Sequence, residues 1–166
     1  MTTPIQIWTC ATHHTAFRCG GWAYVREVQG LISGVAGGER NTTARRMALA
    51  GLAAALRDLP AVGASAPISI QTTSPDLVAL ADFLATLGPS SGASDECAVD
   101  LDLWAQILTA AAGRRLAVAR AALEPGSPIA FAAAWAELGM DKAKLKGRFT
   151  ATIPKPNLAR AGLGGG

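Results

Sequence analysis

Alternating apolar and polar positions mark the first forty residues and predict three consecutive β-strands. Pro4–Ala11 and Gly20–Val28 alternate in this way and are rich in β-forming residues, and Leu31–Gly38 follows after a short Gln-Gly turn. Short connections between strands favour antiparallel neighbours. We therefore expect a three-stranded meander at the start of the chain.

Helical and strand patterns alternate from residue 41 onward. Asn41, Thr42 and Thr43 offer N-cap side chains to a helix over Ala44–Leu56, a run of strong helix formers. A buried strand, two helices, a fifth strand and a last helix are expected at Ala66–Ser74, Pro75–Gly88, Val99–Gly113, Arg114–Leu123 and Ser127–Gly139. This order of elements predicts an α/β protein.

The last residues, 149–166, contain two prolines and end in glycines. Proline cannot continue a helix, and glycine-rich ends are commonly mobile, so we expect an extended tail outside a domain of residues 1–148. Such a tail could be a peptide that docks on a partner, and the alternative is a disordered end. The side chains that would dock on a partner or a second copy are Phe149, Ile153, Lys155, Leu158 and Arg160.

Several motifs, in the correct order, resemble type one ribonuclease H. They are "IWTCAT" and "GGWAYV" in the first two strands, "NTTARRMAL" at the first helix, "TTS" after the fourth strand and "DLW" at a later helix. Together they cover most of Ile5–Trp104. The resemblance implies a ribonuclease H-like fold with a five-stranded mixed sheet, in which three antiparallel strands are followed by two parallel ones and helices flank the sheet.

The same resemblance implies that the catalytic acids are missing. Active members hold two Mg²⁺ ions between carboxylates that here correspond to Cys10, Ala48 and Thr73. The last helix offers apolar residues such as Phe131 and Ala132 where a fourth acid is expected. A thiol is a soft ligand, a hydroxyl a weak one, and alanine supplies none. We expect a pseudoenzyme that binds neither a metal ion nor another cofactor.

Other residues offer metal-ligating side chains, but their patterns are weak. Glu39 and Asp76 stand near the former site, but a solvated loop acid and a first-turn acid that complements the helix dipole explain them more simply. A second group is close in sequence but matches no usual zinc spacing, and consists of Cys10, His13, His14 and Cys19.

Basic ends flank an acidic middle, which can indicate an anionic partner for the basic parts. The family's Asn-Thr-Thr loop holds a DNA phosphate, so the resemblance implies phosphate binding around the first helix. We expect glutamate at residues 45 and 46 to weaken that binding without disturbing the fold. The implied nucleic-acid-binding residues are Arg18, Asn41, Thr42, Thr43, Arg45 and Arg46.

The sequence has no secretory signal, no apolar run long enough to span a membrane, and an odd number of cysteines, so we expect a cytoplasmic protein. We expect it to bind nucleic acid, duplex or hybrid, with little sequence specificity. The alternative is a protein-interaction subunit with a vestigial active site and a docking tail.

Overall fold

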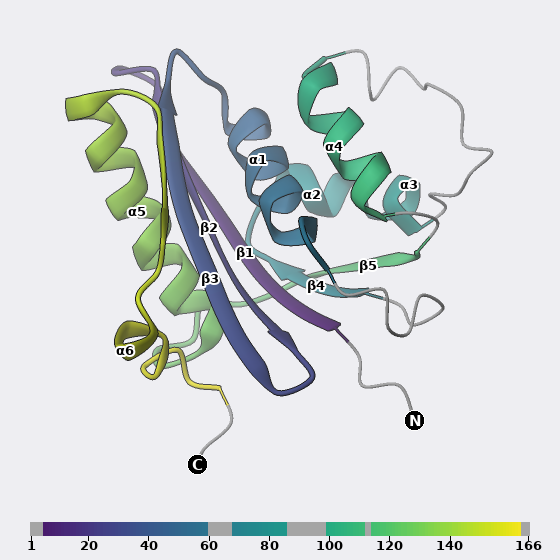
Figure 1. Ribbon diagram of the computed structural model, residues 1–166. Helices are drawn as coiled ribbons and strands as arrows, with labels where there is room; N and C mark the ends of the chain where they lie inside the picture. Colours follow the sequence, from purple (N-terminus) through teal and green to yellow (C-terminus); the bar gives the residue numbers. More distant parts are fainter. Residues whose placement is uncertain (1–4, 60–67, 86–98, 112–113, 164–166) are drawn as a thin grey trace.

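The computed structural model describes residues 5–59, 68–85, 99–111 and 114–163, and a mixed sheet of six strands runs through them (Figure 1). The strand order is β5-β4-β1-β2-β3-β6. β1, β2 and β3 form the expected antiparallel meander, while β4 runs parallel to β1 and β5 parallel to β4. The strands are β1 Ile5–His14, β2 Cys19–Val28, β3 Leu31–Arg40, β4 Ile68–Thr72, β5 Leu116–Arg120 and β6 Phe149–Thr152.

Helices cover both faces of this sheet. α1 (Ala44–Leu56), α2 (Pro75–Ala79), α3 (Ala81–Ala85) and α4 (Leu101–Ala111) lie on one face (Figure 1). α5 (Pro128–Lys146) and the short α6 (Lys155–Leu158) lie on the other, so each face has its own hydrophobic cluster. Among the residues that the structure describes, no helix combines the length and apolar character that crossing a membrane requires.

The first helix has the predicted bounds and the predicted cap. The Oγ1 atom of Thr43 accepts a hydrogen bond from the backbone N–H of Arg46 at 3.0 Å, which satisfies a donor of the first turn. The single helix predicted from Pro75 is wrong, because the chain forms α2 and α3 with a break at Leu80. Its expected end at Gly88, like the end expected at Gly113, lies outside the described residues.

α5 continues beyond Gly139, where the sequence predicted its end. Gly139 serves close packing instead of a helix cap, because a methyl group there would overlap the carbonyl oxygen of Gly37 in β3. A methyl group at Gly38 would likewise lie 2.5 Å from the carbonyl oxygen of Gly139. The helix ends at Lys146 and is capped by Gly147, whose φ of 85° favours glycine. Glycines on both sides thus bring the helix and strand backbones into contact.

The final segment, expected as an extended tail outside the domain, packs against the domain in the residues that the structure describes. β6 pairs antiparallel with β3, from Phe149 opposite Gly38 to Thr152 opposite Val35, and adds a sixth strand to the five predicted. Ile153 and Leu158 are 1% and 6% exposed within the hydrophobic cluster of the α5 face. These two apolar side chains therefore pack inside their own domain, where they offer no surface for docking on a partner. Lys155 and Arg160 remain exposed.

Candidate functional site

Two of the positions that the sequence resemblance matched to catalytic acids lie in contact beside the centre of the sheet. The hydroxyl of Thr73, just after β4, donates a hydrogen bond to the sulfur of Cys10 in β1 at 3.4 Å. The thiol of Cys10 in turn donates to the carbonyl oxygen of Ile129 at 3.4 Å. Burial raises the pKa of the Cys10 thiol, and the hydrogen bond from Thr73 opposes this only in part. Cys10 is therefore a protonated thiol that both donates and accepts a hydrogen bond within the protein.

The surroundings of this pair are apolar. Phe131 and Ala132 of α5 pack in the same hydrophobic cluster as Cys10. These are the residues that the sequence resemblance matched to the region of the fourth acid. Ala48 is buried in the cluster on the opposite face, among the side chains of α1 and its neighbours. The structure thus joins Cys10 to Thr73 and to α5, whereas Ala48 packs with the other layer.

The cysteines and histidines that are close in sequence have separate partners in the described part of the chain. The Nε2 atom of His13 lies 2.9 Å from the carbonyl oxygen of Thr42, and His14 pairs with Cys19 across the β1–β2 ladder. Within residues 5–59, 68–85, 99–111 and 114–163, no group of three or more histidine, cysteine, aspartate or glutamate side chains could hold a metal ion.

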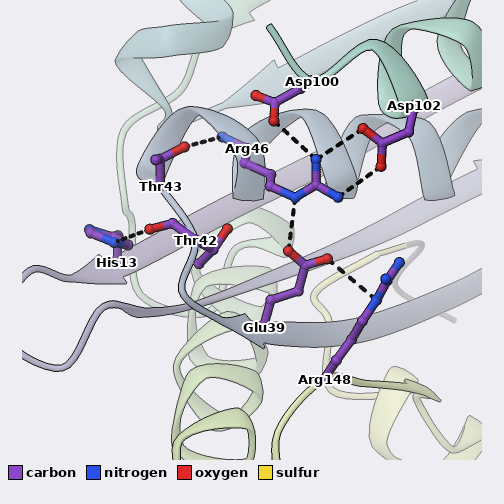
Figure 2. A network of polar contacts seen from close by, with 8 residues as sticks. All are labelled: His13, Glu39, Thr42, Thr43, Arg46, Asp100, Asp102 and Arg148. Atoms are coloured by element: carbon purple, nitrogen blue, oxygen red, sulfur yellow. Dashed lines mark hydrogen bonds and ion pairs between the residues drawn. The ribbon is translucent and has the colours of Figure 1, made fainter.

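Arg46 lies at the centre of an ionic network that joins β3, α1, α4 and the residue before β6 (Figure 2). Its Nε donates to Glu39 at 3.0 Å and its Nη1 to Asp100 at 3.0 Å. Its Nη1 and Nη2 bind the two carboxylate oxygens of Asp102 at 3.0 and 2.8 Å. Arg148 contacts the other oxygen of Glu39 at 3.4 Å. Arg46, predicted to bind phosphate, is instead surrounded by carboxylates of its own chain.

This network explains two strong electrostatic shifts. The hydrogen bonds that Arg46 donates to Asp102 raise the pKa of Arg46, and those to Glu39 and Asp100 add to this effect, which desolvation opposes. Hydrogen bonding to Arg46 lowers the pKa of Asp102 to about 2, from an ordinary value of 3.8. Asp102 begins the predicted "DLW" motif, so in this chain the motif ties the start of α4 to α1.

Acid is therefore expected to weaken the protein through Asp102. Because its folded-state pKa is lowered, the stabilisation is present above about pH 4 and is lost as the pH falls toward about 2. Thermal unfolding of the wild type and of Asp102→Asn across this range measures the effect. The variant should be less stable near neutral pH, and the difference should shrink as the wild-type carboxylate is protonated. A difference that stays constant with pH would contradict this assignment.

The other predicted binding residues surround the start of α1. Thr42 is buried, and its backbone N–H donates to the carbonyl oxygen of Arg18 at 3.2 Å, which joins the β1–β2 turn to the helix entry. Thr43 caps the helix, and Arg45 is half-buried. Arg18 and Asn41 are exposed, each with a φ near 50°. Of the predicted set, Arg18, Asn41 and Thr43 are therefore exposed, and the Thr43 hydroxyl is already used in the helix cap.

Sequence reasoning missed that Phe17 and Lys144 lie together with Arg40 near the β1–β2 turn. Arg40 donates from Nε to the carbonyl oxygen of Ala143 at 3.0 Å and from Nη2 to that of Lys144 at 2.7 Å. The Nζ of Lys144 lies 3.6 Å from the centre of the Phe17 ring. These residues come from the β1–β2 turn, β3 and α5, so no local pattern in the sequence could have grouped them.

A cavity of about 340 Å³ adjoins the ionic network between α1, α4 and β3. Two arginines that line the cavity form hydrogen bonds within the protein. Arg26 donates to the carbonyl oxygens of Ala55 and Arg57, and Arg57 donates to the side-chain oxygen of Gln106. The cavity wall therefore contributes to holding the end of α1.

No protein-family model matches the sequence, and no curated protein matches it either. The structure is similar to the N-terminal RNase H domain of Rv2228c from Mycobacterium tuberculosis, solved as a fusion with maltose-binding protein. The TM-score is 0.62 at 15% identity over 87% of this chain and 98% of that chain. It is also similar to LC9-RNase H1, a type 1 RNase H with the type 2 active-site motif, with a TM-score of 0.58 at 18% identity over 97% and 86% of the two chains. The protein therefore has the ribonuclease H-like fold.

Proposed function

We propose that the protein is a catalytically inactive ribonuclease H-like module that binds nucleic acid with little sequence specificity. The observation that carries this proposal is the Cys10–Thr73 pair, a buried thiol and a hydroxyl at positions that correspond to metal-binding acids. A protonated thiol in an apolar environment is a poor ligand for Mg²⁺, which prefers hard oxygen ligands. Two-metal hydrolysis of a phosphodiester therefore lacks its ligands here.

Exposed cations support the binding part of the proposal. Arg18, Lys144 and Lys146 are exposed near one end of the molecule, where Arg40 also contacts the end of α5. Contacts of this kind recognise the phosphate backbone and carry little base information. With Arg46 held by its carboxylates, the binding surface shifts from the first turn of α1 toward the β1–β2 turn.

Incubation with a labelled RNA–DNA hybrid and Mg²⁺ or Mn²⁺ is expected to leave the hybrid intact, while an active ribonuclease H cuts it under the same conditions. Anisotropy across a salt series should then show binding whose logarithm falls linearly with the logarithm of salt concentration. Arg18→Glu should flatten this slope by about one unit. Cleavage that a chelator abolishes would overturn the inactive assignment, and an absence of salt-dependent binding would overturn the nucleic-acid assignment.

A second candidate is a protein partner on the outer side of α5. Leu138 and Leu145 are 48% and 76% exposed and lie seven residues apart, so they share one side of the helix. Phe131 and Trp135 are half-buried beside them, with ring centres 6.2 Å apart. An apolar stripe of this kind is typical of a contact surface, and it replaces the buried tail residues as the basis of the protein-interaction alternative.

A further inference from the structure

We propose that the end of the molecule around the β1–β2 turn binds single-stranded nucleic acid by stacking a base on Phe17. This inference rests on the proposed function and specifies its ligand. The residues concerned form what we call the Phe17 surface, which consists of His14, Phe17, Arg18, Arg40 and Lys144.

Phe17 is unusual because it is held in place while remaining exposed. Its side chain is 55% exposed. The ring centre of His14 lies 4.7 Å away, and the backbone N–H of Phe17 donates to the Nδ1 of His14 at 3.4 Å. Lys144 places its ammonium group over the ring at 3.6 Å. An aromatic ring that its neighbours already position loses little side-chain freedom when a base stacks on it.

The position of Lys144 is itself fixed by the fold. Arg40, in β3, donates from Nη2 to the backbone carbonyl oxygen of Lys144 and from Nε to that of Ala143, near the end of α5. Arg40 lies directly opposite Cys19 in the β2–β3 ladder. Cys19 follows Arg18 in the sequence, so Arg40 is also close to the β1–β2 turn. The turn, the strand and the helix end are therefore joined into one surface.

Cations dominate the ionic contacts that this surface could offer to a ligand. In the part of the chain that the structure describes, no ion pair engages Arg18, Arg40 or Lys144. The nearby Glu39 directs its two oxygens to Arg46 and Arg148. Cations beside an exposed ring are the combination that single-strand binding uses, because the cations follow the phosphates while the ring stacks on any base.

A duplex makes poor use of Phe17, since its bases are already stacked and paired. A single strand can turn a base onto the ring, so the ring should distinguish the two forms. An acidic peptide would use the same cations but has no base to stack, which makes it the appropriate competitor.

The test measures anisotropy with a labelled oligothymidylate, a duplex of equal length and a polyglutamate peptide of equal charge. Phe17→Ala is expected to weaken oligothymidylate binding by about ten-fold and to leave duplex binding within about two-fold. Lys144→Ala should weaken both, with a flatter salt slope. Matched controls are Leu31→Ala, an exposed apolar residue that begins β3 next to the β2–β3 turn, and Lys155→Ala, an exposed lysine on α6. Neither control should alter binding.

The outcomes separate this inference from the function on which it rests. If the duplex binds but Phe17→Ala leaves oligothymidylate binding unchanged, the stacking inference is wrong and the proposed function stands. If neither nucleic acid binds, both are wrong. If polyglutamate binds as tightly as oligothymidylate and loses as much affinity in Phe17→Ala, the surface recognises acidic peptides and the inference is overturned.

Discussion

Replacing Arg46 with methionine is expected to lower the free energy of unfolding by about 3 kcal/mol, the lower end of the range for removing one partner of a largely buried ionic group. The guanidinium side chain is only 20% exposed and contacts Glu39, Asp100 and Asp102. Without it, three carboxylates would face one another, and Arg148 would be the remaining cation of the network among the described residues. Because Asp102 is 56% exposed, water relieves part of this repulsion. The melting temperature should fall by roughly 10 °C in a thermal scan.

Adding Glu39→Gln or Asp100→Asn to Arg46→Met provides the matched control. Each removes one of the repelling charges, so each should recover part of the lost stability even though it is expected to be harmful alone. A melting temperature of Arg46→Met equal to that of the wild type would show that the network does not hold α1, α4 and β3 together. The earlier expectation that glutamate at residue 46 spares the fold is inconsistent with these contacts, because it would add a fourth acid to the cluster.

Gly139→Ala is expected to destabilise the protein by about 2–3 kcal/mol, although alanine is the better helix former by about 1 kcal/mol. The added methyl group would overlap the carbonyl oxygen of Gly37, and the strand backbone cannot move aside without breaking its pairing with β2 and β6. Denaturant unfolding with a linear fit gives the value directly.

Ala134→Gly measures the intrinsic helix preference at an exposed position of the same helix and should lower stability by about 1 kcal/mol. The two substitutions, opposite in chemistry, are thus expected to destabilise in the same direction. A Gly139→Ala variant that is more stable than the wild type would mean that α5 can rise from the sheet without loss.

The sequence predicted the elements with strong periodicity or specific motifs. The meander and α1, with Thr43 as its cap, agree with the structure because alternation and capping are local signals. The end of α5 was wrong because Gly139 is required by a strand more than a hundred residues away along the chain. The sequence alone does not distinguish a glycine that allows close packing from a glycine that ends a helix.

In the candidate site, too, the sequence predicted what depends on local motifs and missed what depends on contacts between distant residues. Register with a known family identified Cys10 and Thr73, which the structure joins by a hydrogen bond. The same register could not show that Arg46 is held by Glu39 and Asp100, since these acids lie in different elements. Phe17 escaped notice for the same reason: its exposure and its contact with Lys144 exist only after folding.

The pairing of β6 with β3 also covers a strand edge that would otherwise be open to other molecules. Without residues 149–152, the outer side of β3 would present unpaired N–H and C=O groups along Val35–Gly38, a segment with two glycines and no charge. Open strand edges of this kind recruit strands from other molecules. β6 occupies that edge and leads into Pro154, which lacks an N–H to donate. We therefore expect a chain that ends before Phe149 to aggregate more readily through β3.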